Sequence, residues 1–166
     1  VLDAYAGIAT FGICVSDVAE KVTSVEENSS SIQKAKEVLK SNNINNVELF
    51  AQDTLRYLKS IKKKFDIIIL DPPRKGCTQE VLDEVLRHLK SNHSKAESDE
   101  ILRSAQNDAI AEGASKGKII YVSCNPATLA RDLKYLTEHG AKVESIQPFD
   151  MFCHTYHIEN VAIINL

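Results

Sequence analysis

The sequence predicts an open α/β domain, in which helices cover both faces of a mostly parallel β-sheet. Short β-favouring runs alternate with stretches in which apolar residues recur at helical spacing. The run 65–70 is almost continuously apolar, which is typical of a parallel strand covered on both faces. With 166 residues the chain has the length of one domain and can bury a core without disulfide bonds.

The elements are expected in alternating order along the chain. Strands are predicted over 1–6, 21–26, 47–52, 65–70, 118–123, 142–147 and 157–166. Helices are predicted over 29–41, 54–61, 79–89 and 127–138, with a further helix opening after the first strand. A Ser/Asn segment provides the cap before 29–41, the Pro72–Pro73 pair ends the fourth strand, and Gly140 lies just past the last helix.

Segment 91–117 interrupts this alternation, because it is too long for an ordinary connection between a helix and a strand. Its charged residues sum to −2, which is most of the net charge of −3. We expect a solvated insertion here, and the alternative is a docking element for a partner.

The composition excludes several classes of protein. No apolar run approaches the ~20 residues that a membrane-spanning helix needs. The slightly acidic balance argues against a protein that holds nucleic acid by bulk charge alone. The four cysteines are scattered, without a C-x-x-C pair, which favours free thiols in a cytoplasmic protein. Because the chain opens without Met inside a predicted strand, we expect it to be the catalytic end of something longer.

The segment from Asp3 to Gly12 is a candidate cofactor loop. It matches the dinucleotide fingerprint G-x-G-x-x-G at its first and third glycines, Gly7 and Gly12, with Ala9 at the second. Together with Glu26 at the end of the second strand, which is placed to bind ribose hydroxyls, this pattern allows NAD, FAD or S-adenosylmethionine.

Features of that pattern favour S-adenosylmethionine over the dinucleotides. Ala9 takes the position where glycine lets the backbone approach a pyrophosphate, which S-adenosylmethionine lacks. Asp3 would repel a pyrophosphate but can hold the positively charged methionine end, and Asp53 follows the third strand on the adenine side. The structural alternative is a plain tight turn between a strand and a helix.

A second candidate site is the motif Asp71-Pro-Pro-Arg-Lys-Gly76, which follows the fourth strand. Enzymes that methylate amino groups carry an aromatic residue after the two prolines, and here that residue is Arg74, which argues against methylation of adenine N6 or cytosine N4. Asp71 is a candidate to orient cofactor or base. Arg74 and Lys75 either meet a phosphate or belong to a solvated loop.

Cys124 is the one cysteine whose position in the sequence favours reactivity. It ends a buried strand and precedes a helix whose first turn accommodates Pro126. The positive end of the helix dipole favours the thiolate, which is the nucleophilic form of cysteine. The other cysteines are expected to be small buried apolar residues.

Three motifs together resemble the RNA uracil-C5 methyltransferases that act on tRNA and 23S rRNA. They are Asp71-Pro-Pro-Arg-Lys-Gly, Ser123-Cys-Asn-Pro-Ala-Thr-Leu-Ala-Arg-Asp132 and Asp150-Met-Phe-Cys-His-Thr-Tyr-His-Ile-Glu159. The resemblance runs from Asp3 to the end of the chain, apart from 91–117. It implies a Rossmann-like domain with a seven-stranded sheet that uses S-adenosylmethionine, and an RNA-binding part upstream of Val1.

The resemblance also implies the roles of individual residues. Cys124 is the expected nucleophile and Glu159 the expected general base. Tyr5, Thr10, Glu26, Asp53 and Asp71 fall on the family's cofactor-binding positions, and the loop pattern itself adds Asp3 and Gly7 to the expected cofactor-binding residues. Independently of the resemblance, the expected substrate-binding residues are the basic Arg74, Lys75 and Arg131 near the predicted site, together with Asn125.

The predicted activity is C5-methylation of a uridine in RNA through a covalent bond between Cys124 and C6, with 23S rRNA ranked ahead of tRNA as substrate. One alternative is an inactive truncated remnant that binds cofactor or partner, and a second is an NAD-dependent oxidoreductase. No metal is expected, because Cys153 and His157 are only two potential ligands. We expect a monomer with RNA as its partner and no membrane association.

Overall fold

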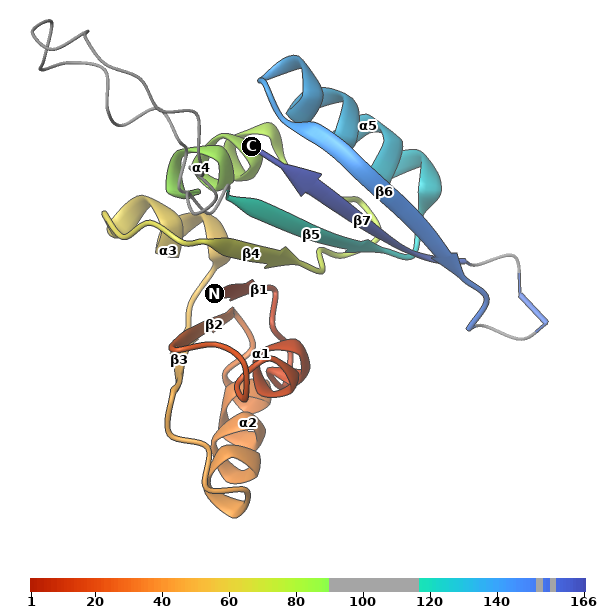
Figure 1. Cartoon of the computed structure of the whole chain (residues 1–166). Helices are drawn as coiled ribbons and strands as arrows, with labels where there is room; N and C mark the ends of the chain where they lie inside the picture. The colour runs from red at the N-terminus through yellow and green to blue at the C-terminus, as the bar shows by residue number, and fades with distance from the viewer. Residues whose placement is uncertain (90–116, 152–153, 156–157) are drawn as a thin grey trace, which may run out of the picture.

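The computed structural model describes residues 1–89, 117–151, 154–155 and 158–166, and Figure 1 shows the arrangement of the chain. The strands are β1 (Leu2–Ala4), β2 (Val22–Glu26), β3 (Val47–Ala51), β4 (Ile67–Leu70), β5 (Lys118–Ser123), β6 (Lys142–Phe149) and β7 (Glu159–Asn165). The helices are α1 (Thr10–Cys14), α2 (Ser29–Ser41), α3 (Thr54–Ser60), α4 (Gln79–His88) and α5 (Pro126–Glu138). The expected insertion, up to residue 116, and both Cys153 and His157 lie outside the described residues.

The strands form one seven-stranded sheet in the order β3-β2-β1-β4-β5-β7-β6. Strands β1 to β5 pair in parallel, whereas β7 runs antiparallel to both β5 and β6. The strand order reverses between β1 and β4, so the chain grows outward from β1 first to one side and then to the other. Such a reversal leaves a crevice at the carboxyl ends of the strands, where open α/β sheets bind ligands.

Helices cover both faces of the sheet, as predicted. Helices α3, α4 and α5 pack side by side on one face, and α1 and α2 pack against β1, β2 and β3 on the other (Figure 1). The largest apolar cluster lies between the sheet and α3 to α5, and it includes the fully buried Leu2, Ile68 and Leu136. Among the described residues, no helix is both long and apolar enough to cross a membrane.

The boundaries of several elements differ from the prediction, for identifiable reasons. The first strand ends at Ala4 because Tyr5 adopts a left-handed backbone conformation with φ +62°. Strand β4 begins at Ile67, and Phe65 forms only an isolated bridge with Leu89. Strand β6 continues to Phe149, which pairs with Glu159 at the start of β7.

Proline is tolerated in this longer β6 because the strand lies at the edge of the sheet. Pro148 pairs with Asn160, and the missing N–H of a proline costs least where a strand has a partner on one side only. The outer helix ends also move slightly: α5 begins at Pro126, and α4 ends at His88.

Candidate active site

Most of the predicted site residues lie at one end of the sheet, where the parallel strands terminate; we call this end the carboxyl edge. Strands β1 to β5 are parallel, so their carboxyl ends all meet at this edge, and the antiparallel β7 begins there. The edge therefore brings together the segments that follow β1, β2, β3, β4 and β5 with the start of β7. These segments carry Tyr5, Gly7, Glu26, Asp53, Asp71, Cys124 and Glu159.

Asp3 is a buried carboxylate in the middle of β1. Its Oδ2 accepts hydrogen bonds from the Gly12 N–H at 2.9 Å and from the Ser24 hydroxyl at 3.2 Å. Its Oδ1 is buried without a hydrogen-bond partner among the described residues. Burial raises the pKa of Asp3 to about 6, and the nearby carboxylates of Asp71 and Glu26 add to this effect.

Gly12 lies so close to this carboxylate and to Ser24 that a larger residue would force these side chains to move. A Cβ at that position would stand 2.4 Å from the Ser24 Oγ and 3.0 Å from the Asp3 Oδ2. The third glycine of the fingerprint thus permits close packing of α1 on β1 and β2, which is its role in cofactor-binding turns.

The loop between β1 and α1 is held by unusual backbone conformations and by one side chain. Tyr5, Gly7 and Ala9 all have positive φ, and Ala9 is the residue that precedes the first turn of α1 at Thr10. The Gly7 N–H donates to the Glu26 Oε2 at 2.9 Å, while the Asn28 N–H donates to the Oε1 at 2.8 Å. Glu26 therefore fixes the loop to the end of β2.

These groups fit S-adenosylmethionine better than a dinucleotide. The orphaned Oδ1 of Asp3 and the neighbouring carboxylates of Glu26 and Asp71 make the crevice anionic, as their mutual effect on the pKa of Asp3 shows. An anionic crevice attracts the ammonium and sulfonium groups of S-adenosylmethionine and repels a pyrophosphate. Asp53 lies further along the edge as the N-cap of α3, where it accepts from the Arg56 N–H at 2.9 Å.

Cys124 and Glu159 lie at the same end of the neighbouring strands β5 and β7. The last pair in the β5–β7 register is Ser123 with Asn160; Cys124 directly follows Ser123, and Glu159 directly precedes Asn160. The Asn160 side chain secures this junction, because its Nδ2 donates to the Ser123 carbonyl at 3.3 Å and to the Ile158 carbonyl at 3.1 Å. Cys124 is half-buried and has a free thiol.

Glu159 has the electrostatic setting expected of a proton acceptor. Partial burial raises the pKa of its carboxyl group, and the charge of Asp71 raises it further. Burial also raises the pKa of Asp71. The charge of Asp71, which follows β4, therefore reaches Glu159 at the start of β7, two strands away in the sheet.

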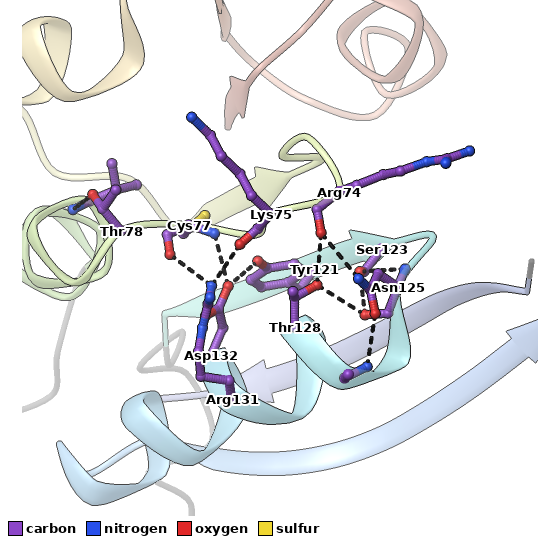
Figure 2. A network of polar contacts seen from close by, with 12 residues as sticks. Arg74, Lys75, Cys77, Thr78, Tyr121, Ser123, Asn125, Thr128, Arg131 and Asp132 are labelled. Carbon is purple, nitrogen blue, oxygen red and sulfur yellow. Dashed lines mark hydrogen bonds and ion pairs between the residues drawn. The ribbon is translucent and has the colours of Figure 1, made fainter.

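Figure 2 shows how the loop after β4 is joined to the segment that carries Cys124. The Arg74 carbonyl accepts from the Asn125 Nδ2 at 3.3 Å and from the Thr128 hydroxyl at 3.1 Å. The Arg131 Nη2 donates to the carbonyls of Lys75 and Cys77 at 2.8 and 3.1 Å. The side chains of Arg74 and Lys75 extend away from this network (Figure 2).

Two of the expected substrate-binding residues thus have contacts within the protein. Arg131 binds two loop carbonyls and the Asp132 carboxylate, and Asn125 caps α5 by accepting from the Ala127 N–H at 3.1 Å. Arg74 and Lys75 are exposed, so they remain the better placed of the four to meet a phosphate.

Sequence reasoning missed the residues that support this site, namely Ser24, Gly76, Cys77, Tyr121, Thr128, Asp132 and Asn160. For Asp132 a signal was present. Leu129, Leu133 and Leu136 form the apolar stripe of α5, and Asp132 lies within that stripe. A charged residue on the buried face of a helix indicates a specific partner.

A cavity of about 590 Å³ lies between the 75–79 segment, α4 and α5. None of the residues that line it belongs to β1, β2 or β3. The buried Asp3 oxygen that has no hydrogen-bond partner among the described residues lies outside this cavity. Within the described residues, no group of three or more His, Cys, Asp or Glu side chains is arranged to hold a metal ion.

Two family models match the chain. The model described as Conserved hypothetical protein 95 matches residues 1–112, which is more than half of the chain. The model described as tRNA (Uracil-5-)-methyltransferase matches residues 105–165, the part that contains Cys124 and Glu159.

Similar proteins and structures agree with these matches. An uncharacterized RNA methyltransferase of Thermotoga maritima is 38% identical over 99% of this chain and 31% of its own length. One from Clostridium tetani is 36% identical over 98% of this chain and 30% of its own. The crystal structure of Pyrococcus abyssi tRNA (uracil-54, C5)-methyltransferase with S-adenosyl-L-homocysteine matches with a TM-score of 0.70 and 30% identity, over 98% of this chain and 33% of that one. This chain therefore spans about a third of the length of the relatives that it matches.

The sheet order and the ligand crevice at its reversal define the class of S-adenosylmethionine-dependent methyltransferases with a Rossmann-like fold. A putative methyltransferase of Streptococcus mutans shares this fold with a TM-score of 0.74 at 15% identity, over 99% of this chain and 44% of its own. Within the class, the chain belongs to the RNA uracil-C5 methyltransferase family, and its first part also belongs to the family described as Conserved hypothetical protein 95.

Proposed function

We propose that the chain catalyses S-adenosylmethionine-dependent methylation of C5 of a uridine in RNA. One observation supports the proposal: a free thiol, Cys124, and a carboxyl group with a raised pKa, Glu159, both directly adjoin Ser123–Asn160, the last residue pair of the β5–β7 register. A nucleophile and a proton acceptor are the two groups that this reaction needs from the protein.

The chemistry explains why a thiol is required. The C5 atom of uracil is a poor nucleophile, and addition of the Cys124 sulfur to C6 gives C5 enolate character. The bound cofactor supplies the electrophilic methyl group that C5 then takes up. The adduct breaks down when the proton on C5 is removed, the C5–C6 double bond re-forms and the thiolate leaves.

Glu159 is the group that takes the C5 proton in this proposal. Its partial burial and the charge of Asp71 raise its pKa, which makes it a stronger base than an exposed carboxylate. Glu159 begins β7 at the end of the sheet where Cys124 follows β5, so in this proposal it acts on the same base as the sulfur. The target base must be unpaired or turned out of a helix to enter such a site.

The remaining expected residues have supporting roles in the proposal. Asp3 and Asp71 attract the positive charges of the cofactor, Glu26 binds its ribose hydroxyls, and Asp53 lies on its adenine side. Tyr5, Gly7 and Thr10 shape the loop around it. Arg74 and Lys75 contact RNA phosphates, while Asn125 and Arg131 support the substrate side of the site from beneath the loop.

Whether the substrate is rRNA or tRNA is a separate question. The sequence ranks 23S rRNA ahead of tRNA, whereas the names of the Pyrococcus abyssi protein and of the C-terminal family model both specify tRNA. The assay therefore presents both kinds of transcript to the protein in parallel.

The test uses RNA labelled with tritium at C5 of uridine. Methylation at C5 expels that hydrogen, so we expect tritium release that requires S-adenosylmethionine and is lost in Cys124→Ala. Cys14→Ala is the matched control, because Cys14 is an exposed free thiol on α1, and it is expected to leave release unchanged. Binding of S-adenosylmethionine without release of tritium from either RNA would indicate the inactive remnant instead.

A further inference from the structure

The loop after β4 contains a glycine at which any other residue would overlap its neighbours. Gly76 has φ +73°, and a Cβ there would stand 2.5 Å from the Asp132 Oδ2 and 2.6 Å from the Arg131 Nη2. The loop backbone therefore lies directly against the side chains of α5 (Figure 2). Such close contact indicates that the position of the loop is set by these two side chains.

Asp132 is the centre of these contacts. Its Oδ2 accepts from the Cys77 N–H at 2.8 Å and from the Tyr121 hydroxyl at 2.5 Å. Its Oδ1 accepts from the Arg131 Nε at 2.8 Å, with the Nη2 of the same guanidinium 2.7 Å away. The side chain is only 2% exposed, so water contributes little and the carboxylate depends on these donors.

The same loop also contacts the two functional parts of the site. On one side, its Arg74 carbonyl accepts from Asn125 and Thr128, which lie one and four residues after Cys124. On the other side, the buried Cys77 thiol interacts electrostatically with the hydroxyls of Tyr121 and Tyr5, and Tyr5 belongs to the cofactor loop. Burial raises the pKa of Cys77 to about 12, so this thiol stays protonated and serves as a packing group.

We propose that Asp132 is a positioning residue, which holds the loop 71–77 in place and through it sets the position of Cys124. The inference rests on the proposed function, in which Cys124 is the nucleophile. Asp132 touches neither cofactor nor base in this account. It acts through Arg131, which binds the carbonyls of Lys75 and Cys77 in the loop. The same loop is also bonded at its Arg74 carbonyl to Asn125, the N-cap of α5, which immediately follows Cys124.

The first test is hydrogen exchange on Asp132→Asn. The substitution removes the charge that pairs with Arg131 and converts one acceptor oxygen into a donor. We expect faster exchange at the Cys77 amide, which bonds to Asp132 directly, and also at the amides of Asn125 and Ala127, which do not. Faster exchange at Cys77 alone would overturn the proposal, because the loss of order in the loop would then not reach the segment that carries Cys124.

The second test is the rate at which the chain forms a covalent adduct with RNA that contains 5-fluorouridine. We expect Asp132→Asn to slow adduct formation by about tenfold to a hundredfold, since small displacements of a reacting group have effects of that size. The dissociation constants for S-adenosylmethionine and RNA are expected to change by less than about threefold, because a positioning defect affects the chemical step. Weakened binding with an unchanged adduct rate would contradict the proposal.

Asp83→Asn is the matched control. Asp83 also joins α4 to α5, since it accepts from the Tyr135 hydroxyl at 2.7 Å, but it lies outside the loop network. It should leave both exchange and adduct rate unchanged. Tyr121→Phe removes a single donor to Asp132 and is the milder variant if Asp132→Asn does not fold. It should give the same pattern at a smaller amplitude, and a wild-type adduct rate with a normal Asn125 amide would refute the inference.

Failure of the proposed function has a different signature. If the wild-type chain forms no adduct at all, the assignment of Cys124 as nucleophile fails. The exchange experiment still decides whether Asp132 sets the position of that segment.

Discussion

The two ends of the site differ in how completely their polar groups are satisfied. At the cofactor end, Asp3 has one buried oxygen without a hydrogen-bond partner among the described residues, and its pKa is raised by burial and by neighbouring carboxylates. At the end that carries Cys124, Asp132 is equally buried, yet four contacts from three residues satisfy it. In the proposed function, the protein therefore holds the Cys124 segment in place before the substrates bind, whereas the carboxylate of Asp3 is left available to attract the cationic cofactor.

The largest effect is expected at the nucleophile end, from Glu159→Gln. Glutamine cannot accept the C5 proton, so the methylated adduct should persist and release of RNA should slow by at least about a hundredfold. Glu144→Gln is the matched control, because Glu144 is an exposed carboxylate on the neighbouring β6. Quench-flow measurement of RNA release checks this, and release by Glu159→Gln at the wild-type rate would remove Glu159 from the base role.

A smaller effect is expected on stability, where alanine substitutions at Gly76 and Gly7 compare the two ends of the site. Gly76 and Gly7 both have positive φ, but only at Gly76 would a Cβ meet other atoms. We expect Gly76→Ala to lower the free energy of unfolding by ~2–4 kcal/mol through strain and overlap, and Gly7→Ala by about 1 kcal/mol through strain alone. Urea denaturation measures both. Equal losses would show that the loop around Gly76 moves aside at little cost.

The third effect concerns pH at the cofactor end. The pKa of Asp3 is raised to about 6 in the folded protein, so this group is mostly protonated at pH 5 and ionised at pH 7.5. Only the ionised form attracts the cationic cofactor, so affinity for S-adenosylmethionine should rise about tenfold over this interval. Asp3→Asn should flatten the profile, and the exposed Asp17→Asn should not. Calorimetric titration at several pH values tests this, and an affinity that falls as pH rises would contradict the placement of the cofactor beside Asp3.

The same carboxylate makes a prediction for the fold without cofactor. Because the folded pKa lies above the usual value of 3.8, the folded state holds a proton that the unfolded state has lost between about pH 4 and 6. The contribution of Asp3 to stability is therefore present below this window and is lost as pH rises through it. Asp3→Asn should remove this part of the pH dependence of unfolding.

The sequence predicted the fold and the edge of the sheet where the site lies, because both follow from local patterns. Apolar periodicity located each strand and helix to within a few residues, and the motifs fell at strand ends. It could not show that Arg131 turns back onto the loop carbonyls of Lys75 and Cys77, since that contact joins segments more than fifty residues apart. The assignment of Arg131 to the substrate rested on its charge alone, and charge does not reveal whether a guanidinium is already hydrogen-bonded.

The partners of Asp132 could not be predicted from the sequence either. Its position on the apolar stripe of α5 indicated a partner, yet the partners lie on β5 and on the loop after β4. Their identity depends on the parallel pairing of β4 with β5, which no local pattern specifies. Conversely, the placement of Cys124 and Glu159 at the same end of β5 and β7 depends on the reversed direction of β7 and became visible only with the sheet order.

The central claim is that Cys124 bonds covalently to a uracil in RNA. The most direct measurement is mass spectrometric mapping of the chain after incubation with 5-fluorouridine RNA and S-adenosylmethionine, since fluorine at C5 blocks the last step and traps the adduct. The account predicts one RNA-linked peptide, which contains Cys124 and is absent in Cys124→Ala. Linkage at Cys14 or Cys77, or cofactor binding with no linked peptide, would contradict it.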